Sequence, residues 1–327
     1  MDDTTKIDLK DRKILYELDL NARQSLNEIG KKVGLNKDSV AYRIKRMEDE
    51  GIIKNYWTAI NTFKLGYNVF RVYINFQLVS SDKKNEIIQY FVKYKNSWAV
   101  VSVKGEIDLD VIIWVNDIYE FYQFWEKTIE LYGDYFQNSA ISILVYVNSY
   151  KKSFLLLEAN EKSDRLLYQT KCGGKTVDID EIDYKLLNEL AVNARAPLIE
   201  LAEKFGCSPQ TINYRINNLI KNGVIQAFRV DIDVSKLGLE KFVLNLYLKN
   251  PKQKKTLINY LKDLSNLEYI DLSIGWADMQ IELILENVNS LTKIMDQIAS
   301  KFPDTIKKQN LMIAEKYHKE RWLPEMY

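Results

Sequence analysis

Hydrophobic residues recur at helical spacing three times near the start of the chain, which predicts three short helices. The first begins near Asp11, because an acidic side chain suits the exposed amides of a helix start. The second covers residues 26–33, and Gly34 ends it, since glycine readily takes the left-handed conformation just past a helix. Asn36 caps the third, which runs to Gly51. A short helix, a tight glycine turn and a longer helix are typical of a helix-turn-helix unit.

After this unit, the hydrophobic pattern changes from a helical to an alternating period. Apolar and polar side chains alternate over residues 69–78, which predicts a strand with two different faces. Before it, β-favouring residues over 52–60 predict a wing or a connecting hairpin. The other expected elements are helices over 82–94 and 118–132 and strands over 99–104, 109–115 and 139–147. Their order, βαββαβ, is that of a ferredoxin-like sheet with helices on one face.

The whole pattern occurs twice. Residues 11–66 align without a gap on residues 183–238, so that Asn21-Ala22-Arg23 falls on Asn193-Ala194-Arg195. The second alternating region is expected to contain strands over 241–248, 269–274, 279–285 and 306–314 and helices over 252–264 and 288–302. A gapless match of this length indicates duplication of a folding unit. Such a chain can form a symmetric pair by itself, which suits a protein that reads two related half-sites.

The repeat divides the chain into two pairs of domains and a linker. The predicted helix-turn-helix domains cover residues 1–60 and 178–232, and the predicted ferredoxin-like domains cover 61–150 and 233–327. The linker, residues 151–177, is expected to hold one short strand around 154–157. The predicted fold class is α+β, a tandem duplication of a winged helix-turn-helix domain plus a ferredoxin-like domain.

The third helix of copy one carries residues that suit a nucleic-acid surface. Val40, Ile44 and Met47 form its core stripe, and the opposite face combines small, aromatic and basic side chains. The candidate DNA contacts are Lys37, Asp38, Ala41, Tyr42, Arg43, Lys45 and Arg46. Lysine and arginine reach phosphates and base acceptors, as a helix in a major groove requires. The alternatives are an ordinary solvated face and, for Arg43, packing of its stem beside the core.

The third helix of copy two has a polar rather than a basic outward face. Its candidate DNA contacts are Gln210, Asn213, Tyr214, Arg215 and Asn217. Asparagine and glutamine can read adenine edges, but they attract phosphate less than lysine and arginine do. Copy two is therefore expected to be either a weaker reader with a different base preference or a unit used mainly for architecture.

Composition narrows the possible functions. The net charge is +1, so a nucleic-acid surface must arise from local charge. Cys172 and Cys207 lack metal-ligand spacing, which predicts reduced thiols in the cytoplasm and no metal or other cofactor. His318 is the single histidine, which weakens readings that need general-base or zinc chemistry. No stretch reads as a signal peptide or membrane span, so no membrane partner is expected.

Several short motifs recur in the same order in both copies. In copy one they are Asp11, Ile14-Leu15, Asn21-Ala22-Arg23, Arg43-Ile44-Lys45-Arg46-Met47-Glu48, Gly51-Ile52-Ile53, Lys64-Leu65-Gly66-Tyr67 and the corner from Gly105 to Asp108. In copy two they are Asp183, Leu187, Asn193-Ala194-Arg195, Arg215-Ile216, Gly223-Val224-Ile225, Lys236-Leu237-Gly238 and the corner from Gly275 to Asp278. Apart from the linker, nearly the whole chain resembles two fused copies of the leucine-responsive/asparagine regulator (Lrp/AsnC) family.

The resemblance implies that each ferredoxin-like domain dimerises through its sheet and binds a small effector, often an amino acid. It also implies double-stranded DNA as a partner and assembly of pseudo-dimers into a homo-oligomer. Carried over, the effector residues lie in the loop between the second and third strands of each sheet: Gly105, Ile107, Asp108, Gly275, Ala277 and Asp278. Tight turns favour the same glycine and aspartate residues without any ligand. Trp276 stands where copy one has Glu106, so the two loops are not equivalent.

We therefore predict a transcription regulator that binds an imperfect palindrome, responds to a small effector and is not an enzyme. One alternative is an enzyme similar to siroheme decarboxylases. These enzymes resemble the same two-domain scaffold in paired halves, and they rely on histidine and arginine residues near the tetrapyrrole. Here His318 stands alone near the end of the chain. Another alternative is a sensor or assembly partner that does not bind DNA, which the polar helix face of copy two favours.

Overall fold

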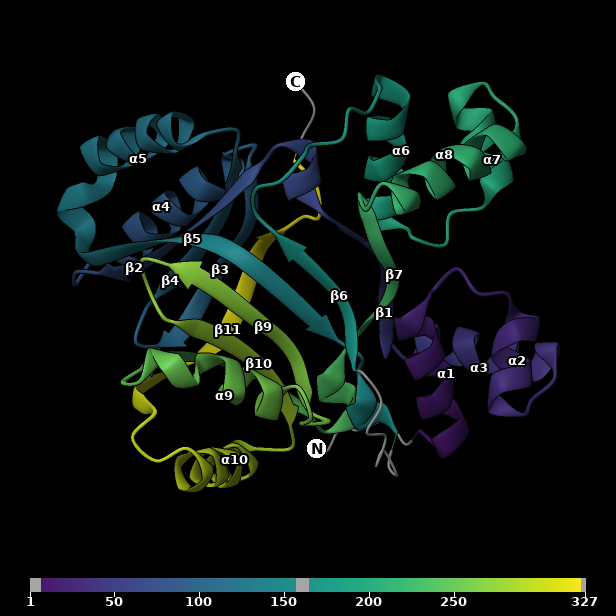
Figure 1. Cartoon of the computed structure of the whole chain (residues 1–327). Coiled ribbons are helices and arrows are strands. Elements are labelled where there is room, and N and C mark those ends of the chain that lie inside the picture. The colour runs from purple at the N-terminus through teal and green to yellow at the C-terminus, as the bar shows by residue number, and fades with distance from the viewer. Residues whose placement is uncertain (1–6, 157–164, 325–327) are drawn as a thin grey trace.

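A computed structural model describes residues 7–156 and 165–324. Two three-helix heads flank a two-stranded ribbon on one side of a closed β-barrel, and four further helices cover the outside of the barrel (Figure 1). None of the helices in these two ranges is long and apolar enough to span a lipid bilayer.

Each head consists of three helices, as predicted. Head one contains α1 (Leu9–Leu20), α2 (Leu26–Val33) and α3 (Lys37–Asp49). Head two contains α6 (Glu181–Val192), α7 (Leu198–Phe205) and α8 (Pro209–Lys221). The expected cap of the first helix is wrong by three residues. Asp8 caps α1, and Asp11 lies inside the first turn, where its carboxylate accepts the Asp8 N–H to complete a capping box.

The strand after each head pairs with its counterpart from the other copy. β1 (Ile53–Ile60) and β7 (Ile225–Ile232) run antiparallel and form the ribbon between the heads (Figure 1). Each strand also packs on the opposite head, since Val230 and Ile232 join the core of head one. Within residues 52–60 the strand β1 therefore pairs with the other copy and does not form a local connecting hairpin.

Both ferredoxin-like units have the predicted βαββαβ order. Copy one contributes β2 (Asn68–Phe76), α4 (Ser81–Lys93), β3 (Ser97–Gly105), β4 (Leu109–Val115), α5 (Ile118–Tyr132) and β5 (Phe136–Tyr150). Copy two contributes β8 (Glu240–Leu248), α9 (Lys254–Leu261), β9 (Leu267–Ile274), β10 (Met279–Leu285), α10 (Val288–Lys301) and β11 (Ile306–Glu320). The predicted helix over 252–264 is shorter, because its first turn is the 3-10 segment Pro251–Gln253.

The two sheets close on each other within one chain. β3 pairs with β11 and β5 pairs with β9, both antiparallel, and the further pairing of β2 with β5 completes a ring. Each strand thus has one face under the outer helices and one face inside the ring. On β2, Phe70 and Val72 pack under α4 and α5, while Arg71 and Tyr73 point into the barrel. The pseudo-dimer suggested by the repeat is an intramolecular barrel.

The linker departs from the prediction. Ser153–Leu155 is a 3-10 turn rather than a strand, and Leu157 lies outside the described residues. The linker strand is β6 (Leu166–Lys171), which pairs with β5. The turn inserts Leu155 into the core of head one, and residues 321–324 after β11 insert Leu323 into the core of head two. Each last strand of the barrel thus continues into a segment that holds one head.

Candidate nucleic-acid interface

The outward face of α3 has the exposure expected of a recognition helix. Val40, Ile44 and Met47 are buried, whereas Tyr42 is 69 % exposed and Lys45 stands beside it. Among the other predicted contacts, Lys37 and Asp38 are exposed, and Ala41, Arg43 and Arg46 are half-buried. The exposed predicted contacts, Lys37, Asp38, Tyr42 and Lys45, therefore lie on the side of α3 that faces away from its core stripe.

Two of the predicted contacts are engaged inside the head. Arg43 donates to Asp8 and Asp11 at 2.8 Å each, and Arg46 donates to Asp11 at 2.6 Å. Asp11 is 1 % exposed, so these bonds form in a partly dry setting that strengthens them. The hydrogen bonds that Arg43 donates to Asp11 and Asp8 raise the pKa of its guanidinium. Arg43 therefore ties α3 to α1, beyond the stem packing considered for it.

Lys45 is held less firmly. Its ammonium lies 2.6 Å from the Asp49 carboxylate one turn later, and both side chains are mostly exposed. The hydrogen bond that Lys45 donates to Asp49 raises the pKa of its ammonium group. Exposed pairs of this kind contribute little to stability, so a phosphate can replace Asp49 at small cost.

The corresponding face of α8 is exposed but contains one cation. Gln210, Asn213 and Asn217 are exposed, and Tyr214, the counterpart of Tyr42, is 66 % exposed. Arg215 repeats the internal role of Arg43: it donates to Asp180 at 2.8 Å and to Asp183 at 2.7 Å. Each copy therefore carries the same internal arginine, and the outward faces differ.

The Asn-Ala-Arg motif locks the two heads together. Arg23 donates to the carbonyl oxygens of Ala194 and Ala196 at 2.7 and 3.1 Å, and Arg195 donates to that of Ala22 at 2.5 Å. Burial and the nearby Arg195 lower the pKa of Arg23. We call this reciprocal contact the head clasp. The motif was recognisable in the sequence because it occurs in both copies. Its structural role could not be predicted, because that role depends on contacts between distant segments.

The predicted effector loops are tight corners against the other copy. A Cβ atom on Gly105 would overlap the carbonyl oxygen of Leu311 in β11, and one on Gly275 would overlap that of Ile141 in β5. Both glycines also have positive φ, 138° and 104°. Each position therefore favours glycine for two reasons, the backbone conformation and the lack of space for a Cβ atom. Ile107 and Ala277 are buried in these corners.

The two aspartates of these corners have equivalent partners. Asp108 accepts the Phe76 N–H at 2.9 Å, and Asp278 accepts the Leu248 N–H at 2.8 Å. The loops differ at one position, where the Trp276 ring stacks on Tyr73 with centroids 4.7 Å apart and Glu106 pairs with Lys308 on the surface. The corner residues therefore support the loops directly, and the two loops are unequal as expected.

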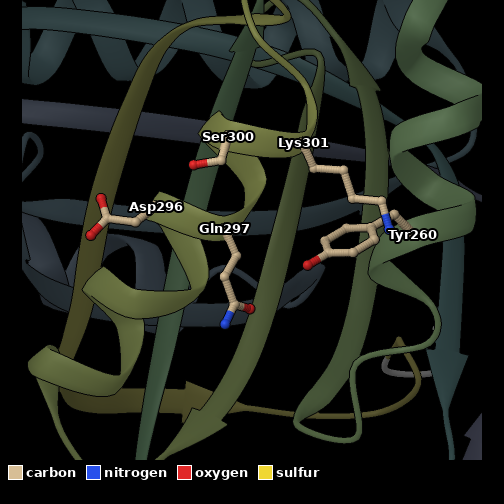
Figure 2. A pocket seen from close by; sticks show the side chains of 5 residues that line it. All are labelled: Tyr260, Asp296, Gln297, Ser300 and Lys301. Atoms are coloured by element: carbon tan, nitrogen blue, oxygen red, sulfur yellow. The ribbon is translucent and has the colours of Figure 1, made fainter.

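A shallow hollow of about 500 Å³ lies between α9 and α10 on the outside of copy two. Its lining residues are Tyr260, Asp296, Gln297, Ser300 and Lys301 (Figure 2). The Lys301 ammonium lies 4.4 Å from the centroid of the Tyr260 ring. The hollow is open and contains none of the predicted site residues.

Sequence reasoning missed a buried ionic joint between head one and the barrel. Asp19 of α1 pairs with Arg229 of β7 at 2.7 Å, and both side chains are fully buried. Arg229 also donates to Ser149 of β5 and to Tyr269 of β9. In the alignment of the copies, Asp19 corresponds to Ala191 and Arg229 corresponds to Trp57. This difference between the copies was the one sequence feature that could have indicated the buried pair.

Comparison with known proteins agrees with this arrangement. A family model of winged helix-turn-helix DNA-binding domains matches residues 7–54 and 179–226. The chain is 34 % identical over 118 residues to the HTH-type transcriptional regulator Ptr1 of Methanocaldococcus jannaschii, which covers 36 % of this chain and 79 % of that protein. It is 28 % identical over 119 residues to the regulatory protein AsnC of Haemophilus influenzae, with the same coverage.

The solved structure of the siroheme decarboxylase NirDL shares the fold over the full arrangement. It aligns with a TM-score of 0.63 over 95 % of this chain and 92 % of that one, at 11 % identity. At this identity the likeness concerns the fold alone.

Heads, ribbon and barrel thus define a two-headed protein with winged helix-turn-helix DNA-binding domains. The chain belongs to the Lrp/AsnC family of transcription regulators, as two copies fused in tandem.

Proposed function

We propose that the chain is a sequence-specific transcription regulator that binds DNA as a covalently linked pseudo-dimer. The observation that carries the proposal is the head clasp, which fixes two exposed but unequal recognition helices in one unit. Two heads held in this way suit two half-sites on one face of DNA, about one helical turn apart or a multiple of it. Because the faces differ, the operator is an imperfect palindrome.

Head one supplies most of the affinity. Lys37 and Lys45 attract phosphates, and Arg43 and Arg46 add positive charge while they hold α3 in place. Asp38, Ala41 and Tyr42 lie where base edges pass in the major groove. This distribution gives binding that falls steeply with salt.

Head two contributes discrimination rather than charge. Gln210, Asn213 and Asn217 match the hydrogen-bonding pattern of adenine edges, with Tyr214 and Arg215 beside them. A second half-site with its own base preference follows from this composition.

A small effector, such as an amino acid, would act on how pseudo-dimers associate in the cytoplasm. Its proposed surroundings are the six corner residues Gly105, Ile107, Asp108, Gly275, Ala277 and Asp278. Support comes from their place at the seam between copies, where each glycine touches a strand of the other copy. An effector that shifts this seam changes the assembly of pseudo-dimers and hence the spacing of heads.

The test is binding of the full chain to random duplex DNA over a range of salt, followed by sequencing of the retained fragments. We expect an enriched, imperfectly palindromic motif and a steep salt dependence. Tyr42→Ala and Tyr214→Ala form a matched pair, because the two rings have equivalent positions and similar exposure. Each should blur a different half-site, while Lys255→Ala on α9 leaves the motif unchanged. No enrichment together with salt-independent behaviour would overturn the proposal.

A second candidate function, tetrapyrrole decarboxylation, is favoured by the fold likeness to NirDL across both halves. The placement of His318 weighs against it. Its Nε2 lies 2.8 Å from the hydroxyl of Ser102, on the helix-covered side of the sheet and near Lys84, not in the barrel interior. Titration with an iron-uroporphyrin III analogue separates the two functions: an unchanged absorption spectrum supports the regulator, and a shifted one supports the enzyme.

A further inference from the structure

The two ends of the barrel interior are related by the repeat but are filled differently. At the copy-one end the interior positions are occupied by Val69, Trp98, Val101, Ile112 and Trp114. Their counterparts at the copy-two end are Lys241, Glu268, Asp271, Glu282 and Ile284. Most of these positions therefore exchange an apolar residue for a charged one.

At these copy-one positions the barrel interior is filled by apolar side chains, while the same strands carry the interior ion pair of Arg71 and Asp110. The Trp98 and Trp114 rings stack in parallel with centroids 5.4 Å apart, and they pack with Val69 and Leu144. Apolar groups in place of a buried ion pair are often neutral or stabilising for a fold. The charges at the copy-two end are therefore not explained by the needs of the barrel.

Side chains at the copy-two end are charged and reach solvent. The Lys241 ammonium lies 3.2 Å from Glu282 and 3.9 Å from Glu268. Glu268 also pairs with Lys152 of the linker through its other oxygen. Lys241 keeps 37 % and Glu282 22 % of its side-chain exposure, so this end of the interior is accessible from outside.

Asp271 makes no ion pair within 4 Å with any described residue, although Arg71, which pairs with Asp110, lies near enough to act on its charge. Four ion pairs match the neighbouring cations one to one: Arg71–Asp110, Arg229–Asp19, Lys152–Glu268 and Lys241–Glu282. Asp271 remains, on the interior face of β9, and no described residue donates a hydrogen bond to its buried Oδ1. Burial and the nearby Glu282 raise the pKa of Asp271 to about 7. A buried oxygen without a donor is unfavourable unless something supplies one.

We propose that the copy-two end of the barrel binds a small molecule that carries a protonated amine, with Asp271 as its main partner. An ammonium group supplies both features that Asp271 lacks, hydrogen-bond donors and a positive charge. Glu282 lies close enough to influence Asp271 and adds negative charge on the same side. The copy-one end, filled by tryptophan rings, has no equivalent carboxylate at Val101 or Ile112.

This site is connected to head one, and this part of the inference rests on the proposed function. From Glu268 the ion pair leads to Lys152, whose backbone N–H donates to Asp19 of α1 at 3.3 Å. At head two, the equivalent joint is the stack of Trp57 on Trp322, with centroids 4.0 Å apart. A ligand that changes the charge around Glu282 and Glu268 therefore affects the contacts of head one, which is the head proposed to supply most of the DNA affinity.

The test is thermal unfolding of the full chain with n-butylamine, putrescine or L-lysine at 10 mM, and with n-butanol as the neutral control. At least one amine should raise the Tm by about 2 °C or more, and butanol should not. The triple variant Lys241→Val, Asp271→Val, Glu282→Ile installs the residues that the chain uses at its other end, and it should lose the shift. Asp271→Asn keeps the shape and should weaken the response at least tenfold, whereas Lys255→Ala should keep it.

The outcomes separate the site from the proposed function. The site is overturned if no amine shifts the Tm, if butanol acts equally, or if Asp271→Asn responds like the wild type. The comparison of Asp271→Asn with the wild type tests the site even when the triple variant does not fold. An amine response without DNA binding keeps the site and removes the regulator, and DNA binding that the amine leaves unchanged removes the coupling to head one.

Discussion

The two heads share an internal scaffold and differ in their outer faces. Arg43 with Asp8 and Asp11 in head one repeats as Arg215 with Asp180 and Asp183 in head two. Outside this scaffold, Lys37 and Lys45 correspond to Pro209 and Asn217. Arg46 adds a second arginine bond to Asp11 in head one, and its counterpart in head two is Asn218. The pairs made by Arg43 therefore recur in both copies, whereas the surface offered to a partner has diverged.

The joints between heads and barrel differ in the same way. Head one is joined through the buried pair of Asp19 and Arg229. In copy one the position of Arg229 is taken by Trp57, whose ring stacks on Trp322 in the segment after β11. Charged joints respond to ligands and pH, because the energy of a buried charge depends on its neighbours, whereas an aromatic stack does not titrate. We therefore expect a response to ligands or pH at the charged joint of head one.

The largest effect is expected from breaking the charged joint. Asp19→Ala leaves Arg229 buried without its partner, which should lower the free energy of unfolding by about 3–5 kcal/mol. Urea unfolding measures the loss. Asp49→Ala, a mostly exposed aspartate on α3, serves as the control and should change stability by no more than about 0.5 kcal/mol. Equal stability of the two variants would show that the joint does not hold head one.

Substitution of the corner glycines should affect both ends of the barrel alike. Gly105→Ala and Gly275→Ala each combine positive φ with overlap of a backbone carbonyl, so each should cost about 2–3 kcal/mol. Gly51→Ala isolates the backbone contribution, because φ there is 72° and no atom lies within 4 Å of the added Cβ. A loss at Gly105 no greater than that at Gly51 would contradict the close approach of the copies.

A smaller effect, with a definite pH dependence, is expected at the charged end of the barrel. Since the pKa of Asp271 rises from 3.8 to about 7 on folding, the stability associated with its protonated form is complete below about pH 4 and is lost as pH rises through 7. Asp271→Asn cannot lose this proton. The difference in Tm between Asp271→Asn and the wild type should therefore increase from about pH 4 to pH 7 and stay constant above pH 7. Thermal unfolding at several pH values measures this difference. An advantage independent of pH would rule out Asp271 as the source.

The smallest effect compares the equivalent positions Lys45 and Asn217. Lys45→Ala should weaken binding to all sequences and reduce the salt slope by about 0.9, the value for one phosphate contact. Asn217→Ala should leave the slope unchanged and relax base preference at one half-site, by about 1–3 kcal/mol for a bidentate contact. Titration of labelled operator DNA at several salt concentrations distinguishes the two results. An unchanged slope for Lys45→Ala would remove that residue from the phosphate contacts.

Local patterns were sufficient to locate most elements. The bounds of α2, β4, α5 and β10 agree with the predicted ranges 26–33, 109–115, 118–132 and 279–285. In these segments the periodicity of apolar residues and the turn residues at the ends point to the same bounds. The first helix was misplaced because Asp8 and Asp11 are both acidic, and the side chain that caps the helix depends on where the chain turns.

Local sequence patterns could not predict which strands pair between the copies or which residues those contacts bury. The alternation along β2 predicted one buried and one polar face, yet Tyr73 is buried inside the barrel. The partner of β1 lies in β7, far along the chain, and the linker strand β6 was recognisable only from its pairing with β5. Contacts between distant segments leave little trace in the order of neighbouring residues.

The repeat, the helix types, the βαββαβ order and the exposed faces of α3 and α8 could be derived from the order of residues, because caps, glycine turns and side-chain periods act over a few positions. The closure of two sheets into one barrel, the head clasp and the charged interior around Asp271 depend on segments about half the chain apart. Their energies come from burial and from the pairing of charges, which exist only once those segments are in contact.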